Sequence, residues 1–181
     1  MNIEPLRLQG AYLITPKPIG DKRGYFMESY RRDKMEEHGL VTNWAQENQS
    51  LSSRKHVLRG LHFQTPPYTE TKLIRVLMGS VLDVMVDLRK GSPTYGEWQF
   101  VELSADNHKT VYIPKGFAHG FCTLTEDVLV AYKVDAFYAP NAQGGLMWND
   151  PTLAIDWPAE EPLLSEKDSQ LPAFEGFESP F

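Results

Sequence analysis

The chain has 181 residues, of which 41% are hydrophobic and 23% charged, a composition typical of one globular domain spanning residues 1–181. A net charge of -6 argues against non-specific nucleic-acid binding, and no apolar run approaches the roughly 18 residues of a membrane-spanning helix. Residues 1–5 have neither region of a signal peptide, and Cys122 is the one cysteine, so an internal disulfide is excluded. We therefore expect a cytoplasmic protein that binds neither nucleic acid nor membrane.

Short segments rich in β-branched and aromatic residues, separated by turn residues, predict strands along most of the chain. In residues 81–88, the apolar even-numbered positions alternate with odd-numbered positions that include Asp83 and Asp87. This alternation predicts a strand with two unlike faces. Residues 31–38 resemble a helix that ends at Gly39, and a second short helical turn is expected in the C-terminal tail. Further strands are expected at residues 11–15, 24–30, 57–64, 72–78, 96–103, 110–113, 117–124 and 128–137.

This series of strands predicts an all-β fold with a few short helices. About nine strands at spacings near ten residues favour a sandwich or barrel, most simply a cupin-like jelly roll. The dozen-residue crossovers that parallel βαβ units need are missing between them. A Rossmann-type nucleotide fold is therefore not expected.

Two of the five histidines, His62 and His119, lie in expected strands. A lone histidine in an apolar strand is commonly a hydrogen-bonded core residue, but two of them beside unusual polar residues favour a site. The spacing Pro114-x-Gly116-x-x-His119 resembles the second motif of the cupins. The histidines therefore indicate a site inside a cupin-like barrel.

Metal-binding cupins carry a His-x-His pair in their first motif, and here the second position of that pair is Gln64. An amide oxygen is a poor ligand for a first-row divalent metal compared with imidazole. His62, His119 and Glu70 alone would make a weak metal site. We expect a barrel without a metal or other cofactor.

Basic residues lie in or beside several strands of this acidic protein. Arg59 stands among apolar neighbours, Lys72 and Arg75 punctuate the next strand, and Arg23 lies on a turn. Because the guanidinium fork matches phosphate oxygens, Arg23 and Arg59 together could clamp a diphosphate. These cations are otherwise explained as ordinary edge-strand charges.

Strand geometry constrains which of these side chains can share a cavity. In a straight strand, Arg59 and His62 point to opposite faces, unless Gly60 hosts a bulge. A hairpin through residues 125–127 would place Tyr132 opposite residue 119 or 121, on the same face as His119. The predicted site depends on both conditions.

Five motifs follow one another along the chain: Asp21-x-Arg23-Gly24-x-Phe26-x-Glu28, residues 57–64 (VLRGLHFQ), residues 113–121 (IPKGFAHGF), Trp148-Asn149-Asp150-Pro151 and Leu164-Ser165-x-Lys167-Asp168. In this order they closely resemble the dTDP-4-dehydrorhamnose 3,5-epimerase family, and the resemblance runs from about residue 10 to about residue 172. It implies a metal-free jelly-roll homodimer that converts dTDP-4-dehydro-6-deoxyglucose to dTDP-4-dehydrorhamnose.

By position, the resemblance implies that His62 is the general base, Asp168 orients it, Tyr132 is the general acid and Lys72 lies beside the keto oxygen of the sugar. Gln143 departs from the family pattern, because many members carry an acidic residue there. The resemblance further implies that the substrate is bound by Arg23, Glu28, Gln46, Glu47, Asn48, Arg59, His119, Gln143 and Lys167.

Three other functions remain open. A mono-epimerase of the same family would invert only C3 or only C5 of a dTDP-4-keto-6-deoxysugar. A metal-dependent cupin oxygenase would hold its metal through His62 and His119. A sugar-binding jelly roll would bind the ligand without exchanging its protons.

Overall fold

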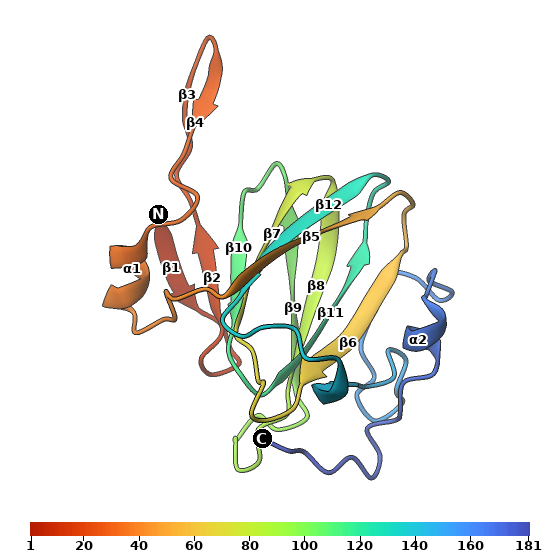
Figure 1. Ribbon diagram of the computed structural model, residues 1–181. Helices are drawn as coiled ribbons and strands as arrows, with labels where there is room; N and C mark the ends of the chain where they lie inside the picture. Colours follow the sequence, from red (N-terminus) through yellow and green to blue (C-terminus); the bar gives the residue numbers. More distant parts are fainter.

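The computed structural model describes residues 1–181 as two facing antiparallel β-sheets, with a hairpin projecting from one end (Figure 1). The six-stranded sheet has the order β1 (Asn2–Pro5), β2 (Tyr12–Thr15), β10 (Thr110–Ile113), β7 (Lys72–Met78), β12 (Val128–Val134) and β5 (Gln46–Ser52). The five-stranded sheet has the order β13 (Gln143–Gly145), β6 (Leu58–Gln64), β11 (Phe117–Thr123), β8 (Ser80–Asp87) and β9 (Trp98–Ser104).

The remaining elements are short. The projecting hairpin consists of β3 (Ile19–Asp21) and β4 (Gly24–Phe26). The helices are α1 (Arg32–Glu37), α2 (Glu166–Ser169) and the 3₁₀ turn η1 (Pro140–Ala142). The predicted all-β jelly roll with a few short helices is confirmed, as two facing sheets rather than a closed barrel. No helix of the protein is long and apolar enough to cross a membrane.

The predicted strands are present, with two of them shortened: the segment predicted at 24–30 ends at Phe26, and that at 128–137 ends at Val134. Four strands were not predicted: β1, β3, β5 and β13. The reason is clearest for β5, whose sequence QENQSLS has no apolar alternation. Its inward side chains line a polar cavity instead of an apolar core, so the usual signal is missing.

Three apolar clusters hold the layers together. The first fills the space between the two sheets, the second lies between the five-stranded sheet and the C-terminal segment, and the third lies between the six-stranded sheet and α1. Helix α1 contributes Met35 and ends at Glu37, and Gly39 just beyond it has a φ of +68°, the left-handed conformation expected of the residue that terminates a helix.

The two faces of residues 81–88 are unlike, as predicted, but β8 is buried on both sides. Met85 faces the other sheet, whereas Val84 faces the C-terminal segment. Asp83 and Asp87 are fully buried on the inner side. The C-terminal segment supplies the second covering layer, which a strand pattern alone does not reveal.

Asp150, in one of the family-like motifs, fixes this C-terminal segment. One carboxylate oxygen accepts hydrogen bonds from the backbone N–H groups of Thr152 and Leu153, and the other accepts from Phe174 at 2.8 Å. A buried carboxylate with three backbone donors is well compensated. The motif therefore has a structural role and leads the chain toward α2.

Candidate active site

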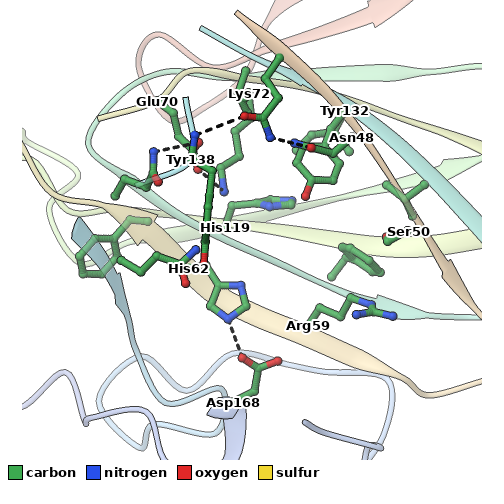
Figure 2. Close-up of a pocket in the computed structure, with 18 of the residues that line it drawn as sticks. Asn48, Ser50, Arg59, His62, Glu70, Lys72, His119, Tyr132, Tyr138 and Asp168 are labelled. Carbon is green, nitrogen blue, oxygen red and sulfur yellow. Dashed lines mark hydrogen bonds and ion pairs between the residues drawn. The ribbon is translucent and has the colours of Figure 1, made fainter. Parts of the chain in front are cut away.

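A cavity of about 570 Å³ opens between the two sheets (Figure 2). Its walls come from β5, β7 and β12 on one side, β6 and β11 on the other, and the segment around α2. The structure brings most of the predicted site residues together here: Gln46, Asn48, Arg59, His62, Lys72, His119, Tyr132, Gln143, Lys167 and Asp168.

The bulge required at Gly60 is present. His119 pairs with His62 and Phe121 pairs with Arg59, so three steps along β6 match two along β11. Gly60 has φ +123°, and a Cβ there would lie 2.6 Å from Gly120 Cα. The backbones can approach this closely only because both residues are glycines, and the bulge lets Arg59 and His62 line the same cavity.

His62 forms a dyad with Asp168, whose Oδ1 lies 2.5 Å from the imidazole Nε2. Asp168 lies in α2, where the N-cap Ser165 accepts its backbone N–H. Burial raises the pKa of Asp168, but hydrogen bonding and the charge of His62, with further hydrogen bonds from Ser165 and Gly60, outweigh burial and lower it. The ionised carboxylate accepts the Nε2 proton, which leaves Nδ1 of a neutral His62 free to take another.

A second histidine–carboxylate pair, absent from the sequence predictions, lies beside the first. His119 Nε2 is 2.9 Å from Oδ2 of Asp83, which is fully buried, and Asp83 Oδ1 has no hydrogen-bond partner. The signal in the sequence was a carboxylate inside an otherwise apolar strand. A strand pattern marks Asp83 only as part of the second face of the strand and does not show that His119, on the neighbouring strand β11, would pair with it.

Tyr132 reaches the cavity by a different route from the one predicted. Strands β11 and β12 do not pair: β11 lies in the five-stranded sheet and β12 in the six-stranded one. The expected hairpin is therefore wrong, and Tyr132 and His119 face the cavity from opposite sheets. Burial raises the pKa of Tyr132, Glu70 raises it further, and Arg59 opposes them.

Lys72 is buried at the beginning of β7, with its ammonium 3.2 Å from Glu70. The Glu70 carboxylate also accepts a hydrogen bond from Gln64 (Figure 2). Gln64, which replaces the second cupin histidine, is otherwise bound to backbone groups, including the N–H of Ala139 at 2.7 Å. No group of three or more His, Cys, Asp or Glu side chains is arranged to hold a metal ion.

Arg59 stands among apolar neighbours in the sequence, which suggests a buried charge, but its side chain is exposed at the edge of the cavity. Its guanidinium donates to Ser52 Oγ at 3.3 Å and to the Leu51 carbonyl at 3.2 Å. On another side of the cavity, Lys167 donates to the side-chain oxygen of Gln143. Both Arg59 and Lys167 are thus available to an anionic ligand.

Three predicted binding residues lie outside the cavity of their own chain. Arg23 is on the β3–β4 hairpin, where its side chain is 84% exposed and paired with Asp21 at 2.5 Å. Glu28 is also exposed, and Glu47 pairs with Lys133 at 2.8 Å on the outer face of the sheet. Within one chain, therefore, Arg23 and Arg59 do not form the predicted diphosphate clamp.

Arg75 also lies away from the cavity. It is three residues from Lys72 on β7, and strand alternation places it on the outer face of the sheet, beside a smaller cavity of about 310 Å³. Its expected contribution to an anion site beside His62 is therefore wrong.

Known proteins are similar to this chain along nearly its whole length. A family model described as dTDP-4-dehydrorhamnose 3,5-epimerase matches residues 5–176. The protein of that name from Pseudomonas aeruginosa is 47% identical over 176 residues, covering 96% of each chain. A dTDP-4-dehydrorhamnose 3-epimerase from Streptomyces niveus is 40% identical, over 93% of this chain and 81% of that protein.

Solved structures agree in fold as well as in sequence. The crystal structure of the Bacillus anthracis 3,5-epimerase with TDP and PPi bound is 46% identical, with a TM-score of 0.93, and covers 96% of this chain and 99% of its own. The Legionella pneumophila 3,5-epimerase in complex with dTDP-4-keto-L-rhamnose is 43% identical, with a TM-score of 0.92 and coverage of 98% and 94%. The chain therefore belongs to the dTDP-4-dehydrorhamnose 3,5-epimerase family and is a carbohydrate epimerase.

Proposed function

We propose that this epimerase converts dTDP-4-dehydro-6-deoxy-D-glucose to dTDP-4-dehydro-L-rhamnose by inverting C3 and C5. The observation that carries the proposal is the His62–Asp168 dyad, which lies in the same cavity as Lys72 and Tyr132. The ligands named in the Bacillus and Legionella structures support a dTDP-sugar as the substrate.

Proton abstraction by His62 begins each inversion. C3 and C5 both flank the C4 ketone of the substrate, so loss of either proton gives an enolate. Nδ1 of His62 takes the proton, and Asp168 stabilises the imidazolium that forms. The histidine side chain is one-third exposed, which leaves it accessible to a sugar entering the cavity.

The enolate must then be stabilised and protonated from its other face. The Lys72 ammonium, held inside the cavity, supplies a positive partner for the developing charge on the C4 oxygen. Tyr132 belongs to the sheet that faces His62, so its phenol donates the new proton from the opposite side. The two carbons react in turn by the same steps.

The polar residues around this centre bind the rest of the substrate. Arg59 offers a guanidinium to the diphosphate, and Lys167 offers an ammonium near the hydrogen-bonded Gln143. The amides of Gln46 and Asn48, joined at 2.7 Å, add hydrogen-bonding groups on β5. His119 completes the binding set from β11.

A homodimer would account for the residues that lie outside the cavity. The β3–β4 hairpin carries exposed apolar side chains, Ile19, Tyr25 and Phe26, on an arm that projects from the sheets (Figure 1). Exposed apolar groups of this kind are typical of a surface that another chain covers. We propose that the hairpin covers a second copy of the chain and brings Arg23 and Glu28 to that copy's cavity.

We also propose a cytoplasmic location. The sequence has one cysteine, Cys122, which is buried and unpaired. Burial raises the pKa of its thiol to about 11, so the thiol is protected from oxidation. This is compatible with a reducing compartment.

NMR in D₂O tests the function directly. Wild-type protein incubated with dTDP-4-dehydro-6-deoxyglucose should incorporate deuterium at C3 and C5 and invert both carbons, also after exhaustive EDTA treatment. Inversion at one carbon alone would make the protein a mono-epimerase, as in the Streptomyces niveus relative. Binding without exchange would identify a sugar-binding protein, and loss of exchange with EDTA, restored by one metal, would overturn the metal-free mechanism.

A further inference from the structure

Glu70 is a carboxylate in the cavity that the proposed mechanism does not use. It lies just before β7, and its side chain is only 15% exposed. Oε1 is 3.2 Å from the Lys72 ammonium, and Oε2 accepts a hydrogen bond of 3.3 Å from Gln64. Both carboxylate oxygens are therefore engaged, each by a different neighbour.

The neighbour on the second side is itself fixed. Gln64 Nε2 also donates to the backbone carbonyls of Tyr68 and Phe137, and its Oε1 accepts the N–H of Ala139. The Gln64 amide is thus held by three separate backbone segments. A carboxylate bound to such an amide has a defined position, and so does the ammonium paired with it.

The same carboxylate acts on Tyr132, the proposed acid. Burial raises the pKa of the phenol most, Glu70 raises it further because a negative charge disfavours a tyrosinate, and Arg59 lowers it. Other charged or titratable groups surround Tyr132. Those in the cavity are Lys72 on β7, His62 on β6, His119 on β11 with its partner Asp83, and Lys167 and Asp168 on α2. Those on the outer face of the six-stranded sheet are Arg75, Lys133 and Glu47.

We propose that Glu70 is a positioning residue of this active site, whose carboxylate, braced by Gln64, holds the Lys72 ammonium where the C4 oxygen of the substrate is bound. This role rests on the proposed enolate mechanism. A second consequence of the same charge is that the Tyr132 phenol stays protonated to higher pH. One carboxylate thereby supports both the group that stabilises the enolate and the group that protonates it.

Replacement of Glu70 by glutamine removes the charge and keeps the size and the acceptor for Gln64. In Glu70→Gln, we expect kcat to fall about 10- to 100-fold with a smaller change in KM, because a misplacement of ~1 Å can cost about 100-fold. In the pH profile of kcat, the decrease at alkaline pH should begin at lower pH in the variant than in wild type. The reason is that a general acid is active only below its pKa, and loss of the Glu70 charge lowers the pKa of Tyr132.

Two further variants separate charge from folding. Glu70→Asp keeps the charge, so its kcat should decrease at nearly the same alkaline pH as that of wild type. Glu37→Gln removes a carboxylate paired with Lys34 at 2.8 Å on the surface of α1 and should change neither kcat nor the pH profile. If kcat fell equally in Glu70→Gln and Glu70→Asp, and its decrease at alkaline pH did not shift in either variant, Glu70 would serve folding alone. That result would overturn the proposal.

A titration that needs no turnover completes the test. Tyr132, labelled with ¹³C at the phenol carbon, should ionise at lower pH in Glu70→Gln than in wild type or Glu70→Asp. Identical titrations would overturn the second consequence, the effect of Glu70 on Tyr132, whereas the kcat of the two Glu70 variants decides whether Glu70 positions Lys72. A wild-type protein that exchanged no substrate protons would instead contradict the proposed function, and the titration would still decide whether Glu70 controls Tyr132.

Discussion

His62 and His119 are cross-strand neighbours on β6 and β11, yet each has its own carboxylate. Asp168 comes from α2 at the edge of the cavity, where the bound histidine stays accessible. Asp83 comes from β8, the strand beside β11 in the same sheet, and is fully buried. The exposed fractions of the two histidines differ accordingly: we propose that the more accessible first pair exchanges protons with the substrate, whereas the second fixes His119 in the wall of the cavity.

Variants of the proposed base and the proposed acid should differ in their effects on deuterium exchange and on inversion of the sugar carbons. His62→Ala should abolish deuterium exchange at C3 and C5, because no enolate forms without the base. Tyr132→Phe should still exchange while inversion falls roughly 10²–10⁴-fold, the usual contribution of a general acid. NMR in D₂O measures both, with His38→Ala on the exposed end of α1 as a control. Inversion at the wild-type rate in Tyr132→Phe would show that another group donates the proton.

Substitutions of His119 and Asp83 should have strongly non-additive effects on the free energy of unfolding, because the two side chains form a buried pair. His119→Ala leaves Asp83 buried with no partner on either oxygen, so we expect a loss of about 3–5 kcal/mol in the free energy of unfolding. The double variant His119→Ala/Asp83→Ala should lose less than the sum of the two single variants, because the isolated charge is gone. Urea unfolding at one protein concentration measures the cycle, and simple additivity would argue against a coupled pair.

Among the secondary-structure elements, β6 and β8 each contain one local irregularity, a bulge in β6 and a hydrogen-bonded turn at the end of β8. The bulge at Gly60 brings Arg59 and His62 to one side of β6. At the end of β8, the Asp87 carboxylate accepts hydrogen bonds from Arg89, Ser92 and Thr94 and so closes the loop before β9. Strand β6 lines the cavity and β8 supplies Asp83 to His119, so both features lie in strands that support the site.

Gly60→Ala tests the close approach at the bulge. A Cβ at Gly60 would lie 2.6 Å from Gly120 Cα and 2.7 Å from the His119 carbonyl oxygen, so the strands must separate. We expect a loss of stability above the roughly 1–3 kcal/mol of backbone strain alone, together with a fall in kcat. Gly24→Ala is the matched control for stability, because its φ is +130° and nothing lies within 4 Å of the added atom. Equal losses in both variants would show that the close approach costs nothing extra.

Asp87 should contribute to acid unfolding. Burial raises the pKa of its carboxyl, but hydrogen bonds from Arg89, Ser92 and Thr94 outweigh burial and lower the pKa to about 2. A lowered pKa in the folded state stabilises the protein above the ordinary value of 3.8, and this contribution is lost as the pH falls from about 4 to about 2. Its size is on the order of 2 kcal/mol. Urea unfolding at pH 5 and 2.5 should therefore show a smaller acid-induced loss in Asp87→Asn than in wild type, and equal losses would contradict this assignment.

At the scale of the whole molecule, the cavity lies between two sheets, and one of its proposed ligands lies on a projecting arm. Arg59 stands at the edge of the cavity, whereas Arg23 extends into solvent on the β3–β4 hairpin (Figure 1). A diphosphate clamp made of both therefore requires two copies of the chain. The proposed dimer and the proposed active site depend on each other in this respect.

Mixing inactive subunits tests this dependence. Arg23→Ala and Arg59→Ala should each weaken dTDP binding in calorimetry and lower activity, because each removes a charged partner of the diphosphate. In a mixed dimer, one of the two cavities regains an intact Arg59 from its own chain and an intact Arg23 from the partner. An equal mixture that exchanges subunits at random should recover about a quarter of wild-type activity. Failure to recover activity, or unchanged dTDP binding in Arg23→Ala, would show that the hairpin does not serve a second cavity.

Local patterns in the sequence were enough to predict the strand-rich fold and to name Gly60 as the one place where a bulge would bring Arg59 and His62 to the same cavity, because alternation and glycine placement act within a few residues. Tertiary structure decided what depends on distant segments. It buried one face of β8 against the six-stranded sheet and the other under the C-terminal segment. It also placed β11 and β12 in different sheets, so Tyr132 faces His119 across the cavity instead of lying beside it. It also paired Asp83 with His119 and Glu70 with Lys72. Burial and charge pairing depend on which surfaces meet after folding, and a strand pattern records only that a side chain alternates, not what will cover it.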